Sequence, residues 1–94
     1  MDAFDNVIPP MLYLPVSDHP DGGHTAIVRE LSDGRSGLLA YTALDRLVRR
    51  CGPNQPWMLL ATADLGSVKQ STPFDVITFD LDIPSVLLAD GRLR

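Results

Sequence analysis

Hydrophobic and polar residues alternate in short blocks along the chain, and Pro, Gly and Asp divide these blocks. Residues 11–14 form an apolar run before Pro15, which predicts a strand that ends there or lies at a sheet edge, because proline lacks a ladder donor. Residues 24–31 alternate with a period of two, as in a half-buried strand. An Asp-Gly pair separates them from the apolar run 37–41, which predicts a β-hairpin.

The clearest helix is predicted directly after this hairpin. Its apolar residues follow the spacing i, i+3, i+4, i+7 and form one buried stripe: Leu44, Leu47, Val48 and Cys51. Thr42 is the expected N-cap, because its hydroxyl can accept a hydrogen bond from a free amide of the first turn. Gly52 and Pro53 are typical of a helix end.

Four shorter elements follow. Residues 57–60 predict a short buried strand, 62–69 a weaker helix, 74–81 a strand and 86–88 a last short strand. The strand–helix–strand unit within this part is expected to be parallel, with a right-handed crossover. The sequence thus predicts an α+β fold with a mixed, mainly antiparallel sheet of about five strands and two helices packed on one face. We expect a flexible N-terminal arm over residues 1–10 and a single domain over 11–94.

The amino-acid composition and net charge limit the classes of molecule that this chain is expected to bind. The chain has 94 residues, 45% of them hydrophobic, and a formal net charge of −4, which suits one globular domain. Affinity for nucleic acid and for anionic membranes depends on basic residues, so neither partner is expected. Cys51 is the only cysteine and the first residues are acidic, which favours a reducing compartment, no signal peptide and a cytoplasmic location.

Several short motifs resemble the SseB-type domain, which is named after an enhanced-serine-sensitivity protein, and in particular its small actinobacterial single-domain relatives. The motifs span residues 11–82 and comprise Leu12-Tyr13-Leu14-Pro15-Val16, Ala40-Tyr41-Thr42-Ala43-Leu44, Cys51-Gly52-Pro53, Gln55-Pro56-Trp57 and Phe74-Asp75-Val76. They are turn and core residues, so the resemblance implies an α+β domain and brings no catalytic residue or cofactor with it.

The most specific candidate for a catalytic site is the apolar strand that ends in Asp80-Leu81-Asp82. It looks like the first motif of haloacid-dehalogenase phosphatases, where the first Asp is the nucleophile, the second is the general acid, and the pair binds Mg²⁺. Ile83 and Pro84 depart from that motif, and too little chain follows to complete such a site. Two solvent-facing carboxylates on one strand face are the favoured interpretation.

Histidine and cysteine offer weaker candidates. His19 and His24 are the only histidines, and Asp18 and Asp21 lie near them in a Gly-rich loop, so these residues are weak candidates for a metal site. No third ligand is obvious, and a solvated loop is favoured. Cys51 is expected to be a buried apolar residue rather than a nucleophile, because it lies on the helix stripe.

Candidate partner-binding residues are Trp57, Tyr13, Arg46, Arg49 and Arg50. Trp57 is expected in the core, with an interface anchor as the alternative, since buried aromatics dominate interface energies. The arginines are expected to face solvent, with an anion site as the alternative.

The favoured function is a non-enzymatic protein-interaction or regulatory module without a cofactor, which binds a protein partner or a second copy through a strand edge. A Mg²⁺-dependent phosphoryl-transfer enzyme using Asp80 and Asp82, and a sensor of a small anionic ligand, are the alternatives.

Overall fold

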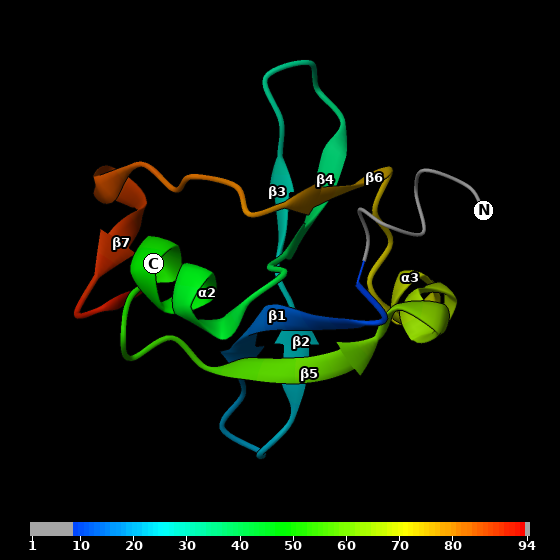
Figure 1. Cartoon of the computed structure of the whole chain (residues 1–94), viewed down its shortest axis with the longest axis horizontal. Helices are drawn as coiled ribbons and strands as arrows, with labels where there is room; N and C mark the ends of the chain where they lie inside the picture. The colour runs from blue at the N-terminus through cyan, green and yellow to red at the C-terminus, as the bar shows by residue number, and fades with distance from the viewer. Residues whose placement is uncertain (1–8, 94) are drawn as a thin grey trace.

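The computed structural model describes residues 9–93 and has an α+β fold (Figure 1). The described strands are β1 (Met11–Asp18), β2 (His24–Ala26), β3 (Val28–Glu30), β4 (Ser36–Ala40), β5 (Trp57–Ala61), β6 (Val76–Phe79), β7 (Leu88–Ala89) and β8 (Arg92–Leu93). The helices are α2 (Leu44–Cys51) and α3 (Leu65–Ser71), with 3₁₀ turns η1 (Thr62–Asp64) and η2 (Ser85–Leu87). Residues 1–8 of the expected arm lie outside the described residues, whereas the carbonyls of Pro9 and Pro10 accept hydrogen bonds from Thr62.

The strands form three small sheets rather than one sheet of about five strands. The first has the order β2-β1-β5 and is antiparallel throughout, and the second has the order β3-β4-β6. In the second sheet β3 is antiparallel and β6 is parallel to β4. The parallel partner of β6 is therefore β4 and not β5, which corrects the expected strand–helix–strand unit. The pair β7-β8 forms a C-terminal hairpin.

Backbone hydrogen bonds join the first two sheets. The Ile27 N–H donates to the Pro15 carbonyl (3.3 Å), and the Ile27 carbonyl accepts from the Leu39 N–H (3.0 Å). Residues 24–30 are thus one extended segment that leaves β1 and joins β4 at Ile27. Tyr13 and Tyr41 also exchange two backbone hydrogen bonds, of 2.9 and 2.8 Å, which attach the end of β4 to β1.

Pro15 lies inside β1, the central strand of its sheet, so the expectation of a strand end or a sheet edge was wrong. The position tolerates proline because the strand opposite it, residues 24–30, leaves β1 and joins β4 at Ile27. On the side of β1 away from β5, the Pro15 carbonyl accepts from the Ile27 N–H, but the Ile27 carbonyl accepts from the Leu39 N–H. The carbonyl that an N–H at position 15 would reach is therefore already bonded to β4, and proline leaves no acceptor without a donor.

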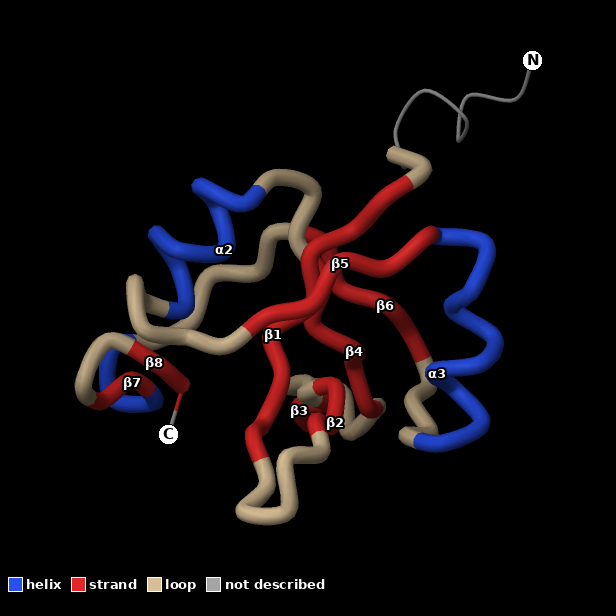
Figure 2. Tube along the Cα trace, turned by 90° about the horizontal axis from the view of Figure 1, so that it is seen from below, coloured by secondary structure: helices blue, strands red, loops and turns tan. Residues whose placement is uncertain are grey.

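The two helices lie at opposite ends of the long axis (Figures 1 and 2) and pack on opposite faces of β1. Leu47 and Cys51 of α2 belong to the core cluster on the Tyr13 side. Leu65 and Val68 of α3 pack against the cluster of Leu12 and Leu14. Successive side chains of a strand point to opposite faces, so the prediction of two helices on one face was wrong. No helix in the described part of the chain is long and apolar enough to cross a membrane.

The C-terminal hairpin docks onto the segment that follows α2. The Asn54 N–H donates to the Gly91 carbonyl (2.8 Å), and the Leu93 N–H donates to the side-chain oxygen of buried Gln55 (2.7 Å). Gly52 has φ of +111°, and a Cβ at this position would overlap the Gly91 carbonyl. The glycine after α2 is therefore required by this close approach as well as by its backbone conformation.

Candidate functional site

All three arginines of α2 face carboxylates. The ion pairs are Arg46–Asp80 (2.7 Å), Arg49–Asp45 (3.6 Å) and Arg50–Asp82. Each guanidinium thus has a neighbouring negative charge, so this helix face is close to neutral. Such a balanced face gives little attraction to a soluble anion.

Asp80 connects the end of β6 to the entry of α2. Its carboxylate accepts hydrogen bonds from the Thr42 N–H (2.9 Å), the Thr42 hydroxyl (2.8 Å) and Arg46 (2.7 Å). Thr42 was expected to cap the helix, but Ala43 is the N-cap residue and Thr42 donates to Asp80 instead. Burial alone would raise the pKa of Asp80, but the hydrogen bonds from Thr42 and Arg46 outweigh burial and hold this pKa below 3.8.

Asp80 and Asp82 have different partners. Asp80 has a left-handed backbone (φ 56°) and is directed to Thr42, whereas Asp82 is 86% exposed and pairs with Arg50. Within residues 9–93, no group of three or more His, Cys, Asp or Glu side chains is arranged to hold a metal ion. The structure therefore does not bring the two carboxylates together as the phosphatase alternative requires.

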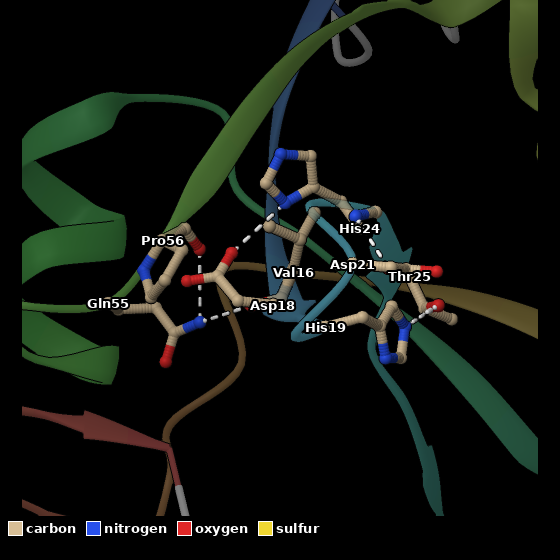
Figure 3. A network of polar contacts seen from close by, with 9 residues as sticks. Val16, Asp18, His19, Asp21, His24, Thr25, Gln55 and Pro56 are labelled. Carbon is tan, nitrogen blue, oxygen red and sulfur yellow. Dashed lines mark hydrogen bonds and ion pairs between the residues drawn. The ribbon is translucent and has the colours of Figure 1, made fainter.

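The histidines stabilise the loop between β1 and β2 (Figure 3). His24 Nδ1 lies 3.0 Å from Asp18 Oδ1, and His19 Nε2 lies 2.6 Å from the Thr25 hydroxyl. Asp21 accepts the N–H of Gly23 in the same loop (2.9 Å). Each imidazole thus has its own exposed partner, and these contacts explain both histidines without a shared metal.

Cys51 is fully buried, in the same core cluster as Tyr41. Burial raises the pKa of the thiol, and the contact with Tyr41 and the charge of Arg29 offset this only in part. The Tyr41 hydroxyl donates to the Leu81 carbonyl (2.8 Å) and is itself buried. Burial and a raised pKa make this thiol a poor nucleophile at neutral pH.

A polar cavity of about 560 Å³ lies between the β1–β2 region and the C-terminal hairpin. Its lining includes Asp18, Arg29, Gln55 and Arg92. The Gln55 side chain, drawn in Figure 3, bonds to the carbonyls of Val16 and Pro56 and to the Leu93 N–H. Its polar atoms are thus used by the fold, and Asp80 and Asp82 do not line the cavity.

Strand β5 exposes its apolar side chains. The exposed fractions are 42% for Trp57, 37% for Met58 and 48% for Leu59, so the prediction of a buried strand with Trp57 in the core was wrong. Tyr13 packs edge-on against Trp57 with ring centroids 5.5 Å apart, and Met11, 40% exposed, lies on the same sheet face. Two of the candidate partner-binding residues, Trp57 and Tyr13, are therefore brought together at this strand.

Among the described residues, no other strand bonds to the backbone groups at the outer edge of β5. The Val16 N–H donates to the Pro56 carbonyl (2.9 Å), and bonded pairs in an antiparallel ladder recur every second residue. Met58 and Leu60, opposite Leu14 and Leu12, therefore use their backbone groups toward β1. The residues between them direct their N–H and C=O groups away from the sheet: Trp57, Leu59 and Ala61. Within residues 9–93 no strand pairs with this edge.

Met11, Met58 and Leu59 were not among the candidates from the sequence. The pattern Trp-Met-Leu-Leu-Ala predicts a strand, but it does not reveal whether that strand is central or at an edge. A signal was nevertheless present, since these five residues contain no charge and no proline. An apolar strand without such protection associates with other strands if it lies at an edge.

No family model, curated protein or solved structure matches this chain. The resemblance to the SseB-type domain therefore stays a prediction. Within residues 9–93, the protein is an α+β domain in which the arginines of α2 are paired with carboxylates and strand β5 has an unpaired apolar edge.

Proposed function

We propose that this domain is a non-enzymatic protein-interaction module that binds an extended segment of another chain along the outer edge of β5. The observation that carries this proposal is the coincidence of unpaired backbone groups with exposed apolar side chains on one strand. Strand addition uses both features, because main-chain hydrogen bonds supply affinity and alternate side chains supply specificity. A cytoplasmic location, expected from the sequence, belongs to the same proposal.

The exposed side chains on the Tyr13 side of the sheet support this mode of binding. Trp57 and Leu59 share this face and are only half-buried. Tyr13 holds the Trp57 ring edge-on, which reduces the side-chain entropy that binding would otherwise cost. Tryptophan and tyrosine are common interface anchors for this reason.

The two alternative functions find less support among the described residues. A phosphoryl-transfer site requires Asp80 and Asp82 to act on one Mg²⁺, yet the two carboxylates pair with different arginines. An anion sensor requires open guanidinium groups, yet Arg46 donates both to Asp80 and to the Thr42 hydroxyl.

The test compares two substitutions at one position. Leu59→Pro removes the outward N–H as well as the side chain, whereas Leu59→Ala removes only the side chain beyond Cβ. Neither affects a hydrogen bond to β1, because the N–H of residue 59 points away from the sheet. The wild-type protein and both variants are used as affinity baits, after circular dichroism has established equal folding.

The proposal predicts partners that bind the wild type, bind Leu59→Ala more weakly and do not bind Leu59→Pro. In the complex with such a partner, the amides of Trp57, Leu59 and Ala61 should exchange slowly with solvent. Partners that bind the wild type and Leu59→Pro equally well would contradict strand addition at β5.

A further inference from the structure

We infer that the segment added to β5 is β5 of a second copy, so that two chains form an antiparallel dimer with its two-fold axis at Leu59. This inference rests on the proposed function and specifies the partner. The sheet β2-β1-β5 would then continue across the axis into the same three strands of the second copy. A symmetric dimer is the commonest soluble oligomer, and its interface uses one surface twice.

The geometry of the edge is self-complementary. The residues whose N–H and C=O groups point away from β1 are the first, third and fifth of a five-residue strand. The central residue, Leu59, is therefore one of them, and a two-fold axis can pass through it. With the axis at Leu59, the two Leu59 residues form one bonded pair, and Trp57 pairs with Ala61 of the second copy on either side. These three pairs provide about six interchain hydrogen bonds, which satisfy every outward group of both strands.

The sizes of the side chains are also compatible with antiparallel pairing of two β5 strands about Leu59. Across the axis the largest side chain of the strand, Trp57, lies opposite the smallest, Ala61, while the two Leu59 side chains face each other. On the other face Met58 lies opposite Leu60. Each cross-strand pair is apolar, and the bulkiest side chain, Trp57, opposes the smallest rather than its own copy. Apolar cross-strand pairs of this kind stabilise a sheet.

Charge also favours a second copy. Like charges directly opposite each other would destabilise a symmetric pair, and residues 57–61 contain no charged side chain. The net charge of −4 on each chain opposes association only at long range, and salt screens this repulsion. We therefore expect the dimer to become tighter as ionic strength rises.

Another edge strand, β6, fits a copy of itself less well. β6 has four residues, so an outward residue cannot occupy its centre. Its neighbours in sequence are Asp75 and Asp80, and an antiparallel copy would bring these acidic ends of the two strands toward each other. Self-pairing is therefore expected at β5 and not at β6.

The first experiment tests association. Sedimentation equilibrium of the full chain over a wide concentration range should show the mass rising from 10.3 kDa to twice this value. Leu59→Ala should weaken the dimer, and Leu59→Pro should abolish it. A dimer that Leu59→Pro leaves unchanged would overturn both this inference and the proposed use of the β5 edge.

The second experiment tests the register. Leu59→Cys should form an interchain disulfide under mild oxidation, because bonded antiparallel neighbours have Cα atoms about 5.5 Å apart. Ala61→Cys, on the same strand face, is the matched control and should not crosslink, since it lies opposite Trp57. Native Cys51 is buried and should not react. Equal crosslinking of both variants would overturn the axis at Leu59.

A strictly monomeric wild type would overturn the inference, and amide exchange then identifies the reason. If the Leu59 amide exchanges rapidly and Leu59→Pro still abolishes capture of another protein, the partner is a different chain and the proposed function stands. If the Leu59 amide exchanges slowly in the monomer, residues of the same chain cover the edge, and the proposed function fails with the dimer.

Discussion

The carboxylate of Asp80 accepts two hydrogen bonds from Thr42, a residue 38 positions earlier in the chain. The Asp80 N–H also donates to the Ala40 carbonyl (3.0 Å), so backbone and side chain together fix the end of β6 against the start of the α2 segment. The carboxylate that most resembled a catalytic nucleophile in the sequence thus has a complete structural explanation.

Substitution of Asp80 should therefore reduce stability. Asp80→Asn removes the charge and leaves only one acceptor atom for the three donors of Thr42 and Arg46. Hydrogen bonds to charged groups contribute about 1.5–3 kcal/mol, and we expect a loss of this size in the free energy of unfolding, measured in urea.

Asp82→Asn is the matched control, because Asp82 is exposed and its pair with Arg50 resembles other surface salt bridges. Its effect should be below about 1 kcal/mol. Equal losses for the two variants would contradict the structural role of Asp80.

The Asp80 contribution should also depend on pH. The pKa of Asp80 lies below 3.8 in the folded chain because the hydrogen bonds from Thr42 and Arg46 outweigh the effect of burial. A lowered folded pKa gives stability that is present above pH 3.8 and is lost as pH falls through the folded value. The difference in unfolding free energy between wild type and Asp80→Asn should thus be constant near neutral pH and shrink in acid. A difference that grows in acid would contradict this account.

Local patterns in the sequence predicted the hairpin and helix well. The Asp-Gly pair before Arg35 marks the β3–β4 hairpin, and the apolar stripe around Leu47 and Cys51 marks α2 and its buried face. These signals succeed because turn geometry and helical periodicity depend on neighbours in sequence.

The features that the sequence did not predict depend on contacts between residues that are far apart in the chain. Pro15 is tolerated in a central strand because the Ile27 carbonyl opposite it accepts from the Leu39 N–H of β4. The Thr42 hydroxyl does not cap α2, because it donates to Asp80 and accepts from Arg46. Trp57 lies on the edge strand β5, whose outer side pairs with no other strand within residues 9–93. The spacing of residues in the sequence does not reveal which distant segments pair. The candidate site at β5 could therefore be predicted to be a strand, but not to be an edge strand.

Two glycines provide a second test of the packing. Gly52→Ala places a Cβ into the Gly91 carbonyl and requires φ of +111°, so it should destabilise the protein by more than about 1 kcal/mol. Gly66→Ala is the control within α3, where no heavy atom lies within 4 Å of the added Cβ. That change should stabilise the protein by about 0.5–1 kcal/mol, because alanine favours a helix. The comparison is made by thermal or urea unfolding, and the opposite order would contradict the docking of the C-terminal hairpin.

Amide hydrogen exchange at two neighbouring residues tests the central claim, association through the β5 edge, most directly. The Leu60 amide faces β1 and should be protected at every protein concentration, whereas the Leu59 amide faces outward. We predict that Leu59 exchanges rapidly in dilute protein and becomes protected as the concentration rises. A Leu59 amide that exchanges at the same rate over the whole concentration range would contradict self-association at this edge.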